Sequence, residues 1–489
     1  MQAEDMMDIR AEIARRRAAD IQTVGAGQGL NIPEKRMLPL VPFLQSPGVI
    51  CEVKRCSPSV KNINNLLDPV LLARKYVESG ICSISVLTEQ NYFSGSLADL
   101  INIKTAMPEV AILRKDFLLD PEDVEISFRA GADAFLLIAS LLDADMLKRM
   151  YDRGIELGMT PVVELHSRED IAKAAAFKPA LIGINSRDLR IFRIKPLQPL
   201  KIRALIEWDC RIIYESGIKT GYDIDFVKGT GFDAVLVGEA AVRNPEFALA
   251  LSASFAEKPE ADSAGESAEL FGFWEKLYGR YRLHSPDASR PLVKICGITN
   301  HDDLGRVIDL GADVAGFILA ESPRQVSPSF IESCRNFDIL KVGVVVLQEG
   351  EALPDEIAAL LESGALDAIQ FHGNELPAEY LKWPGYKAAR VKDEEAVIQA
   401  AALPGPAVLV DAFSSAAYGG TGKRIEDELV RKVSSQQTLW LAGGITPDNV
   451  RGLIDDYSPE LIDISSGVES RPGIKDQNKL AKLFGGING

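Results

Sequence analysis

The stretch Val49-Ile-Cys-Glu-Val-Lys-Arg-Cys-Ser-Pro-Ser59 joins a short apolar run to a group of ionisable and small polar residues. The same arrangement returns in Leu292-Val-Lys-Ile-Cys-Gly-Ile-Thr299. Both halves of the chain repeat such apolar runs, and amphipathic stretches separate them, which is typical of a parallel sheet covered by helices. Polar residues directly after buried strands indicate a (β/α)8 barrel, because its active site lies at the carboxyl ends of the strands.

Each half of the chain holds eight candidate strands, and 489 residues are too many for one compact core. We therefore predict an α/β chain of two tandem (β/α)8 TIM barrels, the first with an extra N-terminal helix. The strands expected in the first barrel are Val49–Val53, Ser83–Leu87, Val110–Leu113, Ala134–Ile138, Pro161–Val163, Leu181–Ile184, Arg211–Tyr214 and Ala234–Val237. The strands expected in the second are Leu292–Ile295, Val314–Ile318, Leu340–Val346, Ala368–Phe371, Tyr386–Val391, Ala407–Val410, Leu439–Ala442 and Leu461–Ile464.

Composition sets the expected domain boundaries. Residues 256–269 are acidic and small, which indicates a linker, and the aromatic-rich stretch after them indicates a helix packed on one of the barrels. We predict a first barrel over residues 1–255, a linker and connecting helix over 256–290, and a second barrel over 291–489.

The extra N-terminal helix is expected before the turn-rich stretch that starts at Gly25. Met6, Ile9 and Ile13 share its apolar face, and Arg10 and Arg15 to Arg17 are expected mostly on the other side.

Charge and cysteine content limit the partners. A formal net charge of −16 argues against nucleic acid or an anionic membrane surface, and no apolar run is long enough to span a bilayer. Met1-Gln-Ala-Glu-Asp5 is not a basic start followed by an apolar stretch, so we expect no secretory signal, and the six cysteines form no CxxC pair. We expect a cytoplasmic monomer with no metal and no cofactor.

Four ionisable residues fall at or near strand ends of the first barrel: Glu52, Lys54, Lys115 and Glu164. Glu52 and Lys54 are two residues apart on one strand, so their side chains point the same way. A structural ion-pair network would explain any one of them. Four in one barrel mouth favour an acid and a base whose pKa values are shifted by their neighbours.

Glycines follow the seventh and eighth expected strands in Glu215-Ser-Gly217 and Val237-Gly-Glu239. Ordinary turns also use glycine. At these two strands, however, backbone N–H groups often bind phosphate in (β/α)8 barrels, so we predict a phosphate site there.

Several motifs of the first half together resemble those of the indole-3-glycerol phosphate synthase family over about residues 1–254. They are Glu52-x-Lys-x-x-Ser-Pro-Ser59, Ser85-Val-Leu-Thr-Glu89, Leu113-Arg-Lys-Asp-Phe117, Gly183-Ile-Asn-Ser-Arg-Asp-Leu189 and Glu215-Ser-Gly217. The resemblance implies that a carboxyphenylamino-deoxyribulose phosphate closes to indole glycerol phosphate with loss of carbon dioxide and water.

The same resemblance implies roles for single residues. Lys115 would be the general acid, Lys54 would hold the substrate carboxylate, and Glu164 would be the base. Glu52 would orient the cationic groups, and Asn185 would position the intermediate. Substrate binding is expected from Ser57, Phe117, Arg187, Ser216, Gly217, Gly238 and Glu239. One departure is that Glu239 follows Gly238 where the family often has a serine, so a backbone donor remains but a hydroxyl contact is lost.

The second half places a different set of groups at its strand ends. Cys296 follows the first strand, where Lys294 and a glycine would favour its thiolate, although a free cysteine is more often a small apolar core residue. Asp411 follows the sixth strand and could pair with Cys296 as acid and base. Arg324 offers a fork for a carboxylate, and His372 is either a ligand contact or a core histidine. A second phosphate site is expected from Gly443, Gly444, Ser465, Ser466 and Gly467.

The motifs around these residues resemble the phosphoribosylanthranilate isomerase family over about residues 291–489. They are Lys294-Ile-Cys-Gly-Ile-Thr299, Ser322-Pro-Arg324, Gln370-Phe-His-Gly373, Asp411 followed by Gly419-Gly-Thr-Gly422, Ala442-Gly-Gly-Ile445 and Asp463-Ile-Ser-Ser-Gly-Val-Glu469. The resemblance implies an Amadori rearrangement in which Asp411 protonates the furanose oxygen and Cys296 removes the C2 proton. Arg324 would bind the anthranilate carboxylate, and residues 419–422 would form a mobile flap.

The two resemblances together imply a bifunctional chain of tryptophan biosynthesis that acts on phosphorylated anthranilate sugars. One alternative is a barrel pair that handles histidine intermediates, but paired aspartates would then be expected at the strand ends. Another is a scaffold that has lost one activity, although the matched polar residues are present in both halves.

Overall fold

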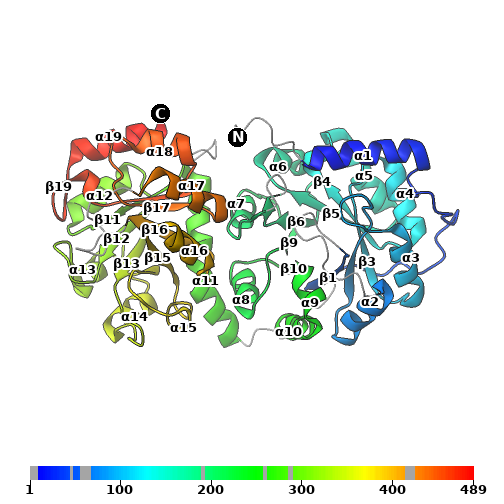
Figure 1. The fold of residues 1–489 in the computed structure, drawn as a ribbon, viewed down its shortest axis with the longest axis horizontal. Coiled ribbons are helices and arrows are strands. Elements are labelled where there is room, and N and C mark those ends of the chain that lie inside the picture. Colours follow the sequence, from blue (N-terminus) through cyan, green and yellow to red (C-terminus); the bar gives the residue numbers. More distant parts are fainter. Residues whose placement is uncertain are drawn as a thin grey trace. The chain divides into compact units, whose positions relative to one another are not determined.

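The computed structural model describes residues 9–44, 48–55, 68–188, 193–256, 261–284, 290–412 and 425–489. The chain divides into two compact units, Met1–Ser267 and Ala268–Gly489. Each unit contains a closed barrel of parallel strands (Figure 1). The predicted fold class, two tandem (β/α)8 barrels, is confirmed.

The first barrel closes in the strand order β1-β10-β9-β6-β5-β4-β3-β2. Its strands are β1 (Val49–Val53), β2 (Ser83–Leu87), β3 (Ala111–Lys115), β4 (Ala134–Ile138), β5 (Thr160–Leu165), β6 (Leu181–Asn185), β9 (Arg211–Glu215) and β10 (Ala234–Val237). Nearly every strand residue is buried, because side chains fill the barrel on one side and helices cover the other.

Helices alternate with these strands and surround them (Figure 1). They are α2 (Pro69–Glu78), α3 (Leu97–Ala106), α4 (Pro121–Ala130), α5 (Ala144–Glu156), α6 (Arg168–Ala175), α7 (Gln198–Ala204), α8 (Gly221–Gly229), α9 (Glu239–Arg243) and α10 (Pro245–Ala256). Several begin where a polar side chain accepts hydrogen bonds from the first turn. Asp120 and Thr220, for example, form capping boxes at α4 and α8.

Helix α1 (Ile9–Val24) precedes the first barrel strand, as predicted. Ile13 on this helix is buried, but the expectation that Arg17 lies on the outer side is wrong. Arg17 is four residues after Ile13 and therefore shares its face. Its guanidinium is buried and lies 2.7 Å from a carboxylate oxygen of Asp123 on α4.

The second barrel closes in sequence order, from β11 to β18. Its strands are β11 (Leu292–Cys296), β12 (Val314–Ile318), β13 (Leu340–Val345), β14 (Ala368–Phe371), β15 (Gly385–Val391), β16 (Val408–Ala412), β17 (Trp440–Ala442) and β18 (Leu461–Ile464). Its helices are α12 (His301–Asp309), α13 (Pro328–Ser333), α14 (Asp355–Glu362), α15 (Pro377–Tyr380), α16 (Glu394–Ala402), α17 (Asp427–Gln436), α18 (Val450–Tyr457) and α19 (Gln477–Asn488).

Helix α11 (Ala261–His284) packs on the second barrel, a point that the sequence left open. The Trp274 and Trp440 ring centroids lie 5.5 Å apart, and those of Phe273 and Tyr386 lie 6.1 Å apart. The Tyr278 hydroxyl donates to the carboxylate of Glu460. The helix begins at Ala261, inside the predicted linker. Its aromatic second half is buried.

Two short antiparallel hairpins lie outside the barrels and were not predicted. The pair β7 (Arg187–Asp188) and β8 (Arg193–Ile194) follows β6, and the pair β19 (Glu469–Arg471) and β20 (Ile474–Lys475) follows β18. Each hairpin brings charged side chains back to the carboxyl end of its barrel. Within the described ranges, none of the helices is long and apolar enough to cross a bilayer.

Candidate active sites

A cavity of about 510 Å³ opens at the carboxyl ends of the first barrel's strands. The predicted residues that line it are Glu52, Lys54, Lys115, Phe117, Glu164, Asn185, Arg187, Ser216, Gly217, Gly238 and Glu239. Ser57 lies outside the described residues. Side chains from six strands or the loops after them therefore meet around one space.

Lys115 is the central cation of this cavity. Its Nζ lies 3.3 Å from an oxygen of Glu164 and also donates to the carboxylate of Glu215. A second pair lies on β1, where Lys54 Nζ is 3.0 Å from an oxygen of Glu52. The predicted convergence of two lysines and two glutamates is present, together with a third carboxylate.

The three buried groups around Lys115 have shifted pKa values. Burial opposes the charge of Lys115, but Glu215 and Glu164 outweigh it and raise the lysine's pKa. Burial would also raise the pKa of Glu164, yet Lys115 and His166 hold it well below its usual range. For Glu215, burial is stronger than the attraction of Lys115, and its pKa rises to about 7. The site thus contains a carboxyl group that titrates near neutral pH.

Glu215 was not predicted as a functional residue, although its motif was recognised. It ends β9 and pairs in register with Asn185 on β6. Gly183 leaves room for it, since a Cβ at that position would lie 2.2 Å from a Glu215 carboxylate oxygen.

His166 was also missed. Its Nε2 lies 2.7 Å from the second oxygen of Glu164, so the glutamate is held between the imidazole and Lys115. The signal was present in the sequence, because Glu164 and His166 are two residues apart at a strand end and point the same way.

The turns after β9 and β10 have backbones suited to binding an anion. Ser216 and Gly217 both adopt positive φ, +70° and +84°, so their turn departs from ordinary extended backbone. At Gly238 a Cβ would lie 2.5 Å from Lys54 Nζ and 2.8 Å from Glu52 Oε1, so this turn runs close to the ends of both side chains. Both turns line the cavity beside the ionisable groups.

An aromatic pair forms one wall of the cavity. The rings of Phe93 and Phe117 are stacked, with centroids 6.4 Å apart. Phe93 was not predicted, because it lies in a loop rather than at a strand end. Its backbone N–H donates to Glu89, which fixes the loop. The wall suits a flat aromatic ring.

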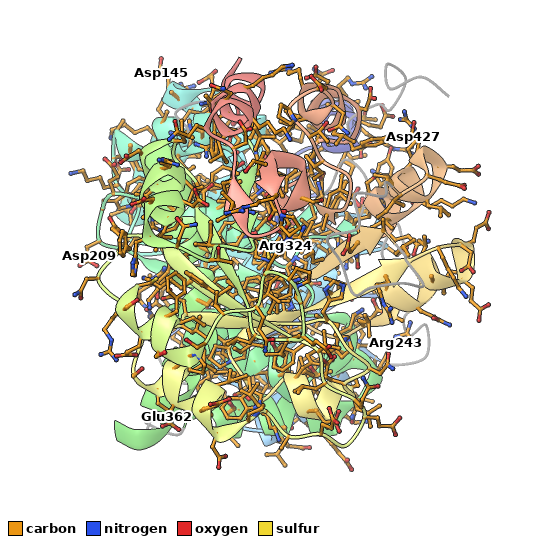
Figure 2. The ribbon with its side chains drawn as sticks, turned by 90° about the vertical axis from the view of Figure 1, so that its left-hand side faces the viewer. Asp145, Asp209, Arg243, Arg324, Glu362 and Asp427 are labelled. Carbon is orange, nitrogen blue, oxygen red and sulfur yellow. The ribbon has the colours of Figure 1, made fainter. Side chains whose placement is uncertain are left out.

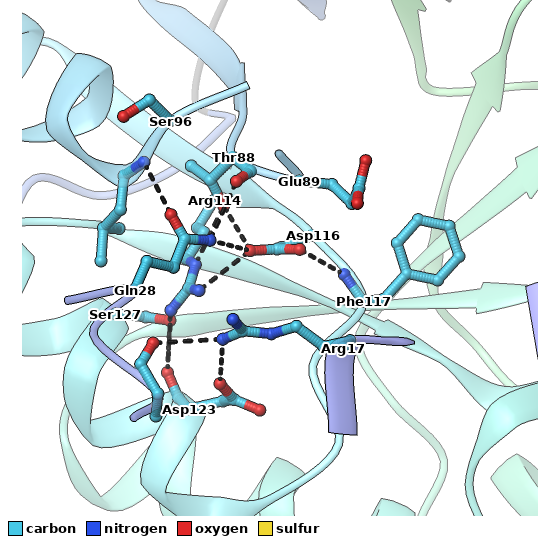
Figure 3. A network of polar contacts seen from close by, with 12 residues as sticks. Arg17, Gln28, Thr88, Glu89, Ser96, Arg114, Asp116, Phe117, Asp123 and Ser127 are labelled. Carbon is cyan, nitrogen blue, oxygen red and sulfur yellow. Dashed lines mark hydrogen bonds and ion pairs between the residues drawn. The ribbon is translucent and has the colours of Figure 1, made fainter. Parts of the chain in front are cut away.

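Buried polar residues hold the strand segment that carries Lys115 (Figure 3). Arg114 and Asp116 flank Lys115 and pair with each other at 2.9 Å. Thr88 and Gln28 also donate to Asp116, and Asp116 accepts from the backbone N–H of Phe117. Burial opposes the charge of Asp116, but Arg114 outweighs it and lowers the pKa of this carboxyl.

A second cavity, of about 1000 Å³, opens at the carboxyl ends of the second barrel's strands. It is lined by all of the predicted residues of that half, namely Cys296, Arg324, His372, Asp411, Gly443, Gly444, Ser465, Ser466 and Gly467. Residues 419–422, predicted as a flap, lie outside the described residues.

Cys296 and Asp411 face this cavity with raised pKa values. Burial raises the pKa of the Cys296 thiol, and Lys294 offsets this only partly. Burial therefore opposes the thiolate that Lys294 was expected to favour. Lys294 is fully buried and is held by Asp463 and Gln370, each at 2.6 Å. Burial also raises the pKa of Asp411 to about 6.

His372 lies beside Asp411, with Nε2 3.7 Å from a carboxylate oxygen. Burial, with Lys387 and Lys294 nearby, lowers the pKa of His372 to about 3. The imidazole is therefore neutral at physiological pH. It can contribute hydrogen bonding and shape, but no positive charge.

The turns after β17 and β18 resemble those of the first barrel. Gly443 and Gly444 have φ of +88° and +64°. A Cβ at Gly443 would lie 2.8 Å from an oxygen of Asp411, so this turn closes on the acid. Among the described residues, the buried hydroxyl of Ser465 has no hydrogen-bond partner, which leaves a donor for a ligand.

Arg324, which is labelled in Figure 2, follows β12 in the chain. It lines the second cavity, and its exposed fraction is only 9%. Its Nε and Nη2 atoms donate hydrogen bonds to the carboxylate of Glu469. In the ranges that the structure describes, no three His, Cys, Asp or Glu side chains gather as metal ligands would.

The fold and these two cavities define a tandem (β/α)8-barrel enzyme with one site in each barrel. Residues 9–253 match the family model of indole-3-glycerol phosphate synthase, and residues 293–485 match that of N-(5'phosphoribosyl)anthranilate (PRA) isomerase. The chain belongs to the indole-3-glycerol phosphate synthase family, with a PRA isomerase domain after the synthase domain.

Known relatives match either nearly the whole chain or one of its two halves. A multifunctional tryptophan biosynthesis protein of Schizosaccharomyces pombe is 29% identical over 99% of this chain, and the chain spans 65% of its length. An indole-3-glycerol phosphate synthase of Rhodopirellula baltica is 40% identical over 42% of this chain and 80% of the relative. A solved phosphoribosyl anthranilate isomerase from Thermotoga maritima is 30% identical, with a TM-score of 0.36, over 40% of this chain and 98% of that one.

Proposed function

We propose that the chain carries out two consecutive steps of tryptophan biosynthesis. The second barrel isomerises N-(5-phosphoribosyl)anthranilate to 1-(2-carboxyphenylamino)-1-deoxyribulose 5-phosphate, and the first barrel closes this aminoketone to indole-3-glycerol phosphate. The observation that carries the proposal is that Lys115 and Glu164 line one cavity, while Cys296 and Asp411 line the other. The two family matches support the same division.

In the first barrel, Lys115 acts on the ketone of the aminoketone. As the aryl carbon attacks the carbonyl carbon, Lys115 donates a proton to the carbonyl oxygen, and carbon dioxide then leaves the aryl carbon. Because Glu215 contacts Lys115 and titrates near pH 7, it can return a proton to the lysine. Glu164 then takes a proton from the carbon beside the nitrogen, while the hydroxyl accepts a proton from the reprotonated Lys115 and leaves as water, which makes the new five-membered ring aromatic.

Each part of this substrate is assigned to its own group of cavity residues. The phosphate is held by backbone N–H groups of the turns at Ser216, Gly217 and Gly238. The aromatic ring packs on Phe93 and Phe117. Lys54, with Arg187, attracts the carboxylate that is lost.

In the second barrel, Asp411 protonates the furanose oxygen and the ring opens to a Schiff base. Cys296, as the thiolate, then removes the C2 proton, and the resulting enolamine becomes the aminoketone. A pKa of about 6 lets Asp411 carry a proton close to neutral pH. The turns at Gly443 to Gly444 and at Ser465 to Gly467 hold the phosphate, and Arg324 binds the carboxylate.

The expected cellular setting follows from the chemistry of the chain. Cys51, Cys82, Cys210, Cys296 and Cys334 are free thiols in the described structure. Free thiols support a reducing compartment such as the cytoplasm. We also propose that the chain is a monomer, which sedimentation equilibrium tests directly.

The proposed function is tested by giving phosphoribosylanthranilate to the purified chain in buffer with a metal chelator and no added cofactor. Anthranilate-ring fluorescence and indole absorbance are followed together, and the products are separated by chromatography. We expect the aminoketone to form and then give indole glycerol phosphate. If folded protein forms neither product, the proposal is contradicted. If only the aminoketone accumulates, the role of the first barrel is contradicted.

A further inference from the structure

Glu469 ends the motif that supplies Ser465 to Gly467, but the reaction scheme gives the glutamate itself no role, and it is nearly inaccessible to solvent. It begins the hairpin β19–β20, and its carboxylate accepts bidentate hydrogen bonds from Arg324. Arg324 Nε lies 2.9 Å from Oε1 of Glu469, and Nη2 lies 2.8 Å from Oε2. Burial would raise the pKa of Glu469, but Arg324 and Lys475 outweigh it and keep the carboxylate ionised.

Lys475 holds this carboxylate from the other strand of the hairpin. Glu469 and Lys475 are partners in the antiparallel register, and Lys475 Nζ lies 3.0 Å from Oε1 of Glu469. The same ammonium donates to the backbone carbonyls of Cys296, at 2.6 Å, and Ser465, at 3.3 Å. Through the buried side chains of Glu469 and Lys475, the hairpin is fastened to the loop of Arg324, to the end of β11 and to the turn after β18.

A guanidinium has two edges that can each hold a carboxylate with two hydrogen bonds. Glu469 occupies the edge formed by Nε and Nη2. Among the described residues, none accepts a hydrogen bond from Nη1 of Arg324, and Arg324 lines the second cavity. The edge formed by Nη1 and Nη2 is therefore the one that a ligand can use.

Packing fixes the stem of Arg324 as well. Gly297 has a φ of +76°, and a Cβ there would lie 2.8 Å from Cδ of Arg324. The arginine is thus held by a glycine turn along its stem and by a carboxylate at its head. Without Glu469, the head of this long side chain would regain rotamer freedom that ligand binding must remove again.

We propose that Glu469, held by Lys475, is a positioning residue that presents the Nη1 and Nη2 edge of Arg324 to the aromatic carboxylate of the isomerase substrate. This inference rests on the proposed isomerase function and deepens it, because it assigns a determinant of carboxylate recognition outside the reacting groups. The hairpin then selects substrates whose ring carries a carboxylate beside the nitrogen.

The inference is tested by steady-state kinetics of the isomerase step in the full chain, with a double-mutant cycle of Glu469→Ala and Arg324→Ala. Arg471→Ala, an exposed substitution on the same hairpin, is the matched control. We expect Glu469→Ala to raise KM about tenfold and to change kcat about threefold or less, since coupling energies between contacting charges are of this order. In the Arg324→Ala background, Glu469→Ala should leave KM unchanged.

Glu469→Gln keeps the side-chain volume and one acceptor oxygen, so its KM should lie between those of wild type and Glu469→Ala. If the alanine variant does not fold, the same cycle is run with the glutamine variant. An equal effect of the Glu469 substitution in both backgrounds, or an unchanged KM, would overturn the inference. A wild-type chain that fails to isomerise phosphoribosylanthranilate would instead overturn the proposed function.

Discussion

The Nζ atom of Lys115 lies 3.3 Å from Oε2 of Glu164, while Glu215 contacts the same ammonium from another strand. One cation thus serves two buried carboxylates. The pKa of Glu164 is held low, whereas that of Glu215 rises to about 7. Two neighbouring carboxylates with well-separated pKa values can supply different protonation states at one pH, as acid and base chemistry requires.

The shifted carboxyl of Glu215 can be observed directly. In protein with 13C-labelled glutamate side chains, we expect one carboxyl resonance of the first barrel to titrate near pH 7, because burial disfavours its ionised form. Glu215→Gln should remove this resonance. The same titration persisting in the variant would show that another group is responsible.

The isomerase step should have a pH profile with an acid limb near pH 6. The reaction needs Asp411 protonated and Cys296 ionised. As pH rises, however, Asp411 loses its proton before Cys296, because its pKa is the lower of the two. Below about pH 6 both groups are protonated, so the thiolate fraction and kcat/KM fall as pH falls. Between the two pKa values the competent fraction is constant, and above the thiol's raised pKa it falls again because the acid is lost.

This profile is measured as kcat/KM for phosphoribosylanthranilate, with stopped-flow mixing at each pH. The activity of the first barrel on the aminoketone provides the comparison in the same protein. A kcat/KM that rises continuously as pH falls below 6 would contradict the roles assigned to Asp411 and Cys296.

The aromatic wall of the first cavity should contribute to substrate affinity. Phe93→Ala removes one ring of the stacked pair, and we expect KM for the aminoketone to rise about fivefold or more, since such contacts are worth about 1 kcal/mol beyond buried area. Phe93→Tyr keeps the ring and should stay within about twofold of wild type. If the alanine variant keeps the wild-type KM, the aromatic part of the substrate binds elsewhere.

The ion pair between α1 and α4 should matter for stability of the first barrel. Arg17→Met leaves Asp123 buried without its cation and should lower the free energy of unfolding by about 3 kcal/mol. Arg15→Met removes an exposed pair with Glu12 and should cost less than about 1 kcal/mol. Urea unfolding is followed by 19F NMR of 5-fluorotryptophan at Trp208, a tryptophan of the first unit. Equal losses for both variants would contradict this account.

Strands were predictable because each is an apolar run, but their ends were less so. The expected end of β3 was Leu113, whereas the strand continues to Lys115, which pairs in register with Leu87. The two extra residues are charged, so a hydropathy pattern stops before them. Arg114 is nevertheless fully buried, because Asp116 and Thr88 hold its guanidinium.

Candidate site residues could be predicted where an ionisable or small polar side chain directly follows an expected strand. Partners that are distant in the sequence could not be predicted. Arg324 was identified as a carboxylate fork, but Glu469, which holds it, is 145 residues further along the chain. The sequence contains the glutamate within a recognised motif, and only the folded barrel places it beside the arginine. Arg17 and Asp123 are a similar case, 106 residues apart.

The most direct test of the central claim is a pair of variants assayed on both substrates. Lys115→Ala should convert phosphoribosylanthranilate to the aminoketone and stop there. Asp411→Ala should leave phosphoribosylanthranilate unchanged and still convert added aminoketone to indole glycerol phosphate. If either substitution abolishes both activities in folded protein, the assignment of one reaction to each barrel is contradicted.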